Sequence, residues 1–238
     1  MPVSRQPLTP KIDASILAEY IPADPDRRRE IVLDQCVEPQ GPKYYRAADE
    51  TVCSYLLGIP KQERAVRMKI EVLKALGVYA HDKIVKIGDN IAALESFLAH
   101  PKRELLDGLE MLPGPRNGML RMAGVDIAVA PEIIAVDPMT DSFGLIKLRF
   151  SRSPLGPHEA GHLTSMLQAF AQACATQFNG TLNLDLTCVV DVFDGTLIRA
   201  SSARAGRWSE VRAACAEIAS SWALLHARPR GAARLRRV

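Results

Sequence analysis

Hydrophobic residues in the first hundred positions of the chain recur three and four residues apart, which is the spacing of one face of an α-helix. Val66, Ile70, Leu73 and Leu76 follow this spacing, and Gly77 ends the run. The same reasoning predicts helices over Ile12–Ile21, Asp26–Gln35, Tyr44–Leu57, Pro60–Leu76 and His81–Ala99. We therefore expect the first half of the chain to be helical.

The pattern changes after Leu112–Gly118, a stretch with two prolines and two glycines that is typical of a linker. The segments beyond it are rich in valine and isoleucine, which favours β-strands. Asp194-Gly195 is typical of a tight turn between two strands. The sequence predicts strands at Leu120–Val129, Glu132–Val136, Gly144–Phe150, Asn183–Phe193 and Thr196–Ser201, and helices over Pro157–Phe178 and from Ser209 to Leu225.

The resulting order of elements is α-β-β-β-α-β-β-α from about residue 84 onward, which predicts an α+β (mixed α/β) protein. A helical N-terminal half is expected to precede a sandwich with a mainly antiparallel central sheet. Three regions follow from this order: a helical region 1–80, an α/β core 81–226 and a basic disordered tail 227–238.

The composition, with 47% hydrophobic and 24% charged residues among 238, is that of an ordinary globular protein. The five cysteines form no CxxC pair, which argues against a disulfide framework and a cysteine-based zinc site. No stretch approaches the roughly 20 apolar residues that span a bilayer, and the first ten residues have no apolar core typical of a signal peptide. We therefore expect a cytoplasmic protein with no membrane partner.

Basic residues are concentrated toward the C-terminus. Residues 143–238 carry 12 Lys and Arg against 6 Asp and Glu, whereas residues 1–142 carry 18 against 21. Because basic patches bind nucleic-acid phosphates, nucleic acid is a candidate partner, with contacts predicted from Arg149, Arg152, Arg228 and Arg230. For the last two arginines the alternative is a solubilising tail.

One candidate site is the local motif His158-Glu159-Ala160-Gly161-His162. On a helix, histidines four residues apart can share a zinc ion, while the intervening glutamate acts as general base on the metal-bound water. The motif resembles the HExxH signature of zinc metallopeptidases, which implies Zn²⁺ bound by His158 and His162 with Glu159 as the base. The alternative is a helix N-terminus with an acidic residue in its first turn and two surface histidines.

A second candidate site joins two neighbouring strands. Glu132 follows Pro131 at the start of one predicted strand, and Lys147 lies on the next. If Asp137 pairs with Gly144, Glu132 lies opposite Arg149. Since side chains alternate along a strand, Glu132 and Lys147 would then share one face of the sheet.

These elements resemble the PD-(D/E)xK nuclease superfamily, including its RecB- and Cas4-like branches. The resemblance implies Mg²⁺ held by carboxylates and a lysine that positions or activates the attacking water. It assigns catalytic roles to Glu132, Lys147, Asp126 and, on the preceding helix, Glu95, with Glu132 and Asp126 as metal ligands. This chain departs from the superfamily motif at Leu145, a position at which the motif has an acidic residue. Either Asp126 replaces that residue or the domain has lost catalysis.

The chain is also similar to a group of uncharacterised bacterial proteins around Gly144–Ser151 and Val189–Gly195, which brings no known activity. Three functions therefore stay open. The leading hypothesis is a nuclease-like protein that binds nucleic acid, either as a Mg²⁺-dependent phosphodiester hydrolase or as a catalytically inactive relative. The alternatives are a zinc-dependent metallopeptidase and a non-catalytic interaction protein of a mobile or defence locus.

Overall fold

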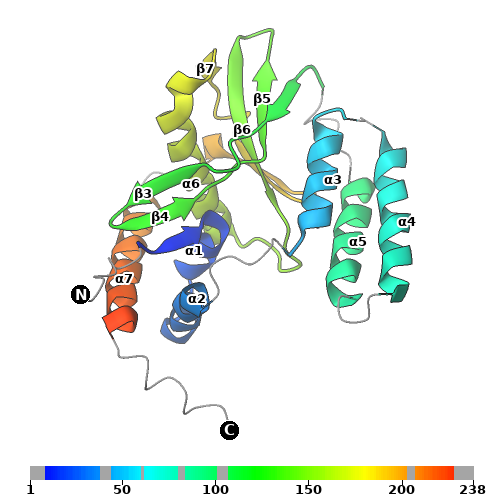
Figure 1. Ribbon diagram of the computed structural model, residues 1–238. Helices are drawn as coiled ribbons and strands as arrows, with labels where there is room; N and C mark the ends of the chain where they lie inside the picture. The colour runs from blue at the N-terminus through cyan, green and yellow to red at the C-terminus, as the bar shows by residue number, and fades with distance from the viewer. Residues whose placement is uncertain are drawn as a thin grey trace, which may run out of the picture.

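The computed structural model describes residues 9–37, 44–59, 62–79, 84–100, 107–202 and 207–227. A mixed β-sheet forms its centre, with helices on both faces (Figure 1). The helices are α1 (Ala14–Tyr20), α2 (Pro25–Val37), α3 (Arg46–Leu56), α4 (Glu63–Tyr79), α5 (Ile84–Ala99), α6 (Pro157–Cys174) and α7 (Arg207–Ala227). The strands are β1 (Lys11–Asp13), β2 (Glu110–Pro113), β3 (Met119–Met122), β4 (Val125–Ala128), β5 (Ile133–Asp137), β6 (Ser142–Arg149), β7 (Thr181–Leu182), β8 (Cys188–Asp191) and β9 (Leu197–Arg199).

The main sheet has the strand order β2-β5-β6-β8-β9, with β7 beside β6. Strands β2, β5 and β6 form an antiparallel meander, and α6 then returns the chain so that β8 lies parallel to β6. Strands β8 and β9 form an antiparallel hairpin around Asp194-Gly195, as predicted. The predicted α+β class, with helices first and a mainly antiparallel sheet afterwards, is confirmed.

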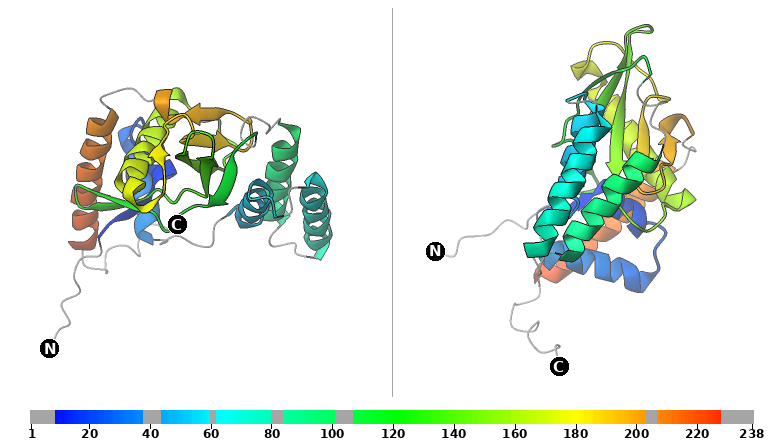
Figure 2. Two further views of the ribbon diagram at one scale, coloured as in Figure 1. Left: turned by 90° about the horizontal axis from the view of Figure 1, so that it is seen from above. Right: turned by 90° about the vertical axis from the view of Figure 1, so that its right-hand side faces the viewer.

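Alternating residues of the main sheet enter two different hydrophobic cores. Phe143 and Leu145 on β6 pack into the first core, together with α1, α2, α6 and α7. Ile146 and Leu148 point the opposite way, into the second core beneath α3, α4 and α5. Figure 2 shows these three helices grouped on one side of the sheet. Because β6 is covered on both faces, it is buried along almost its whole length, unlike a strand with one wet face.

A second, smaller sheet has the order β1-β4-β3. The prediction of one strand over Leu120–Val129 was wrong, because Ala123 and Gly124 both adopt positive φ and turn the chain back as a hairpin. The start of the first predicted helix was also wrong. Residues Lys11–Asp13 instead form β1, which pairs in parallel with β4.

The first strand of the main sheet overlaps the predicted linker. Leu112 and Pro113 of β2 pair with Ile134 and Ile133 of β5. The proline is tolerated because β2 is an edge strand, so its missing N–H breaks no inner ladder. Within the main sheet the α-β-β-β order holds with β2 as its first strand, whereas the chain also inserts β3 and β4 of the small sheet between β2 and β5.

The helices of the first half divide between the two cores. Helices α1 and α2 pack with α6 and α7, whereas α3, α4 and α5 cover the opposite face of the sheet. The boundary predicted after residue 80 lies between α4 and α5, which pack against each other. The predicted tail beyond Ala227 lies outside the described residues. Within the described part of the chain, no helix combines the length and apolarity needed to cross a membrane.

Candidate functional site

Glu132 and Lys147 lie directly opposite each other on neighbouring strands. Ile133 pairs with Ile146, and the N–H of Glu132 donates a 3.0 Å hydrogen bond to the carbonyl of Ile146. The predicted register placed Arg149 opposite Glu132 and was wrong by two residues, because the observed turn is shorter and pairs Asp137 with Ser142. A two-residue shift preserves the side-chain face, so the two side chains still lie together.

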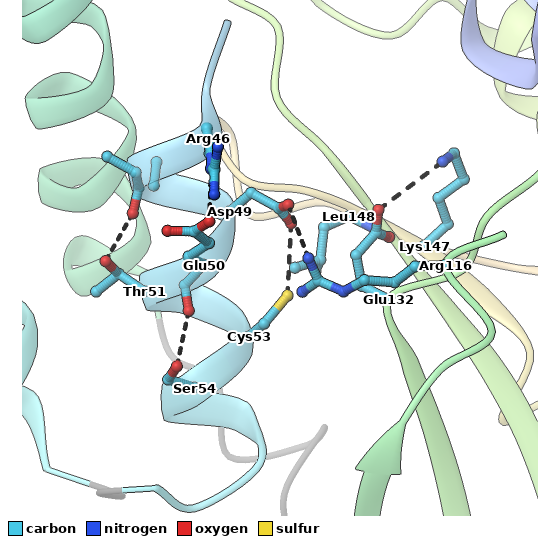
Figure 3. A network of polar contacts seen from close by, with 12 residues as sticks. Arg46, Asp49, Glu50, Thr51, Cys53, Ser54, Arg116, Glu132, Lys147 and Leu148 are labelled. Atoms are coloured by element: carbon cyan, nitrogen blue, oxygen red, sulfur yellow. Dashed lines mark hydrogen bonds and ion pairs between the residues drawn. The ribbon is translucent and has the colours of Figure 1, made fainter. Parts of the chain in front are cut away.

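The two side chains form a buried ion pair, shown in Figure 3. The Lys147 Nζ lies 4.0 Å from Glu132 Oε1, and the two side chains are 6% and 3% exposed. The backbone N–H of Leu148 donates a 2.8 Å hydrogen bond to Glu132 Oε2, which fixes the orientation of the carboxylate. The carboxylate is thus held by the same strand that carries the lysine.

Two influences on the pKa of Lys147 oppose each other. Burial is the largest and lowers the pKa, whereas the nearby charges of Glu132, Asp13 and Asp49 raise it. The three carboxylates together outweigh burial, and the pKa is raised. The surrounding carboxylates thus favour the protonated, positively charged form of Lys147, which is suited to stabilising negative charge.

The pair lines a cleft of about 1340 Å³ at the end of the sheet where β5 begins and β6 ends. Residues of α1 and α2 line it, as do residues from the start of α3 and from the loop between β6 and α6. Its acidic lining residues are Asp13, Glu19, Asp34, Asp49, Glu132 and Glu159. Its basic lining residues are Arg27, Lys147 and Arg149. The cleft is therefore acidic, although the C-terminal part of the chain is basic.

Four of the six lining carboxylates were not identified as site residues from the sequence, and two of these, Asp13 and Asp49, act on the charge of Lys147. Asp49 lies on α3, is buried, and has its Oδ2 3.3 Å from Nη1 of Arg116, while the Cys53 thiol contacts its Oδ1 (Figure 3). Burial, with the Asp49 charge adding to it, raises the pKa of Cys53 well above its usual range. A carboxylate within the buried stripe of a helix was the only sequence signal for Asp49.

Asp13 reaches the cleft from the N-terminal segment. It is the N-cap residue of α1, and its Oδ1 accepts a 2.8 Å hydrogen bond from the N–H of Ser15. The sequence analysis placed Asp13 inside a predicted helix, and local spacing cannot show that β1 pairs with β4 and brings Asp13 to the cleft.

The structure does not bring Asp126 and Glu95 to the Glu132–Lys147 pair. Asp126 belongs to β4 of the small sheet, where its carboxylate lies 3.7 Å from Arg121. Glu95 lies on an exposed face of α5, 3.7 Å from Lys74. Neither residue lines the cleft.

The three residues of the HExxH motif face different surroundings. His158 is exposed, whereas His162 is buried with Nε2 3.2 Å from Glu210 of α7. Glu159 lines the cleft, and its Oε2 accepts a hydrogen bond from the N–H of Gly156 at the start of α6. Burial is the main reason that the pKa of His162 is lowered, and Glu210 opposes this effect. Among the described residues, no group of three or more His, Cys, Asp or Glu is arranged as a metal site.

Arg149 and Arg152, which were predicted to contact nucleic acid, also have different surroundings. Arg149 is committed to an ion pair with Asp191 and to the carbonyl of Ser153. Arg152 is largely exposed and pairs with Asp89 at 2.7 Å. Arg228 and Arg230 lie outside the described residues.

Aromatic side chains line one wall of the cleft. Tyr44, Tyr45 and Phe150 all contribute to the lining. The ring of Tyr45 stacks on Phe150 with centroids 5.9 Å apart and meets Phe193 edge-on at 5.8 Å. These contacts attach the start of α3 to the loops at the ends of β6 and β8.

Comparison of the chain with known proteins gave no match to a protein-family model, to a curated protein or to a solved structure.

Proposed function

We propose that this protein hydrolyses phosphodiester bonds of nucleic acid in the presence of Mg²⁺, with Glu132 and Lys147 as its catalytic residues. The observation that carries the proposal is the pairing of these two side chains on adjacent strands, in the lining of a cleft. A buried charge pair is expensive to desolvate. One that borders a large polar cleft is therefore a good candidate for a functional site.

The position of the pair in the fold supports the same function. In the main sheet, a helix, three antiparallel strands, a crossover helix and a parallel strand come in the order α5, β2, β5, β6, α6 and β8, with β3 and β4 of the small sheet inserted after β2 and the short β7 after α6. This is the element order that the PD-(D/E)xK resemblance implies. Glu132 stands at the start of its second meander strand and Lys147 near the end of the third.

The donor groups at the pair suit a hard divalent cation. Carboxylate oxygens are the ligands that Mg²⁺ prefers, and Mg²⁺ commonly uses only one or two protein carboxylates beside water and substrate phosphates. Glu132 would provide one such ligand, with its orientation fixed by Leu148. When bound, Mg²⁺ would polarise the phosphoryl group and lower the pKa of water.

Lys147 would supply the complementary charge. Because its pKa is raised, it keeps its proton at neutral pH and can stabilise the negative charge that develops on the phosphoryl oxygens. Burial strengthens this effect, since water competes less for the ammonium.

The test is degradation of labelled single- and double-stranded DNA and RNA with Mg²⁺, Mn²⁺ or EDTA. We expect metal-dependent cleavage that falls about 10²- to 10³-fold in Lys147→Met and in Glu132→Gln. The glutamine can still accept the Leu148 hydrogen bond, so the second variant keeps the local fold. Glu71→Gln, an exposed change on α4, is the control and should cleave like the wild type. No metal-dependent cleavage, or full activity in Lys147→Met, would overturn the proposal.

A further inference from the structure

The expected second carboxylate cannot come from β6. Leu145 occupies the position two residues before Lys147 and is fully buried in the first core. The sequence-based replacement, Asp126, lies on the small sheet beside Arg121. A second metal ligand at the cleft must therefore come from another element.

Asp13 can fill this role, because Asp49, the other additional acid that acts on Lys147, is already paired with Arg116. Asp13 lines the cleft with Glu132, and it is one of the three acids whose charge acts on Lys147. Its backbone is fixed on one side by the pairing of β1 with β4 and on the other by the start of α1. A ligand held at such a junction is preorganised rather than carried on a free loop.

The Lys147 ammonium gives an independent sign that the cleft holds a ligand. Its side chain is more than nine-tenths buried, yet within the described residues it makes no hydrogen bond, and its ion-pair contact with Glu132 is 4.0 Å long. Buried ammonium groups are normally saturated with acceptors. Oxygen atoms of a phosphate, or of water on a bound cation, would satisfy the donors that face the cleft.

The charge of the cleft sets the order of binding. Of its three basic lining residues, Arg27 is paired with Glu19 and Arg149 with Asp191. The remaining cation, Lys147, faces several carboxylates. A bare polyanion would be repelled from this surface, and a divalent cation would reverse that repulsion.

We infer that Asp13 and Glu132 together hold one divalent cation in the cleft, and that this cation must be present before a nucleic-acid phosphate can approach Lys147. The inference rests on the proposed function and adds a metal ligand and an order of binding to it.

The test measures Mn²⁺ binding to the full chain without substrate, by electron paramagnetic resonance of free Mn²⁺. Asp13→Asn is the informative variant because asparagine caps a helix as well as aspartate does but lacks the charge. We expect Asp13→Asn and Glu132→Gln each to weaken Mn²⁺ binding at least about tenfold, since each removes one of the two anionic ligands. Asp34→Asn, which removes an exposed carboxylate from the same cleft, should change the affinity less than about twofold, as expected for a partly screened surface charge.

The outcomes separate the inference from the function. Wild-type affinity in Asp13→Asn, with binding lost in Glu132→Gln, would overturn the role of Asp13 and leave the proposed hydrolase intact. An equal loss in Asp34→Asn would also overturn it, because the effect would then be diffuse attraction. If the wild type binds Mn²⁺ but cleaves no nucleic acid, the cation site stands and the proposed function fails. Nucleic-acid binding in EDTA equal to that in Ca²⁺ would refute the binding order.

Discussion

In the buried Glu132–Lys147 pair, the contribution of each side chain to stability depends on the presence of the other. Each side chain is almost fully buried, and the lysine carries its charge because of the acids around it. Removing one member of a buried pair leaves an uncompensated charge, whereas removing both leaves none. The stability of the protein should therefore depend on the pair as a unit.

We predict that Lys147→Met lowers the free energy of unfolding by about 3 kcal/mol, because it leaves the Glu132 carboxylate buried without its cation. The double variant with Glu132→Gln should lose less than the two single variants combined, by about 1 kcal/mol or more. Urea denaturation followed by circular dichroism measures all four proteins. Strictly additive losses would show that the two side chains do not stabilise each other.

At the scale of single residues, the sequence identified the central pair but not its neighbours. Glu132 and Lys147 could be predicted because two adjacent strands with a short turn leave few registers. Asp13 and Asp49 lie far away in the chain, on elements whose contacts with the cleft depend on packing. No local pattern distinguishes such an acid from one on a solvated surface, as Glu95 proved to be.

At the scale of secondary-structure elements, tight packing against β6 limits which residues the strand can contain. Gly144 lies where the chain after β7 crosses the strand, and a Cβ there would meet the backbone of Leu186 at 2.3 Å. A rigid backbone cannot move aside as a flexible side chain can. Glycine is thus required at this position by close approach, although its φ is not positive.

We predict that Gly144→Ala destabilises the protein by about 1–3 kcal/mol, through displacement of Leu186 or of the strand. The matched control is Gly88→Ala in α5, where nothing lies within 4 Å of the added Cβ. Because alanine is the better helix former, that variant should gain about 0.5–1 kcal/mol. Thermal unfolding of both variants decides the matter. If Gly144→Ala leaves the stability unchanged, the segment around Leu186 can move aside without a measurable cost in free energy.

Elements differ in how well the sequence predicted them. The helices were found because their buried stripes repeat over several turns, and α6 begins at Pro157, where a proline suits the first turn. Strands β3 and β4 were merged into one because a short turn at Ala123-Gly124 interrupts an otherwise continuous run of strand-forming residues. Strand β1 was missed because three residues are too few for any periodic signal.

The whole molecule consists of two cores that share one sheet. Strands β5, β6 and β8 each place alternate side chains in the first and second core. Loss of α3, α4 and α5 would expose an apolar face of that sheet to water. The two cores should therefore unfold together rather than as separate units.

We predict that Leu94→Ala, a cavity in the second core, lowers the free energy of unfolding by about 2–5 kcal/mol and shifts every probe equally. Both tryptophans, Trp208 and Trp222, lie on α7 and report on the first core, whereas far-ultraviolet circular dichroism reports on all helices. Leu17→Ala in the first core is the matched control. If Leu94→Ala moves the dichroism transition but not the tryptophan transition, the cores unfold independently.

What the sequence determined by itself is the set of elements with strong local signals: the helices, the hairpin at Asp194-Gly195 and the shared face of Glu132 and Lys147. These depend on spacing within a few residues, or on one short turn, so neighbouring side chains specify them. Tertiary structure alone decided that β1 pairs with β4, that the first two helices join the last one, and that Asp13 and Asp49 reach the cleft. Such contacts join residues far apart in the chain. They form because they bury whole apolar faces of helices and sheets, and no local sequence pattern shows which faces will meet.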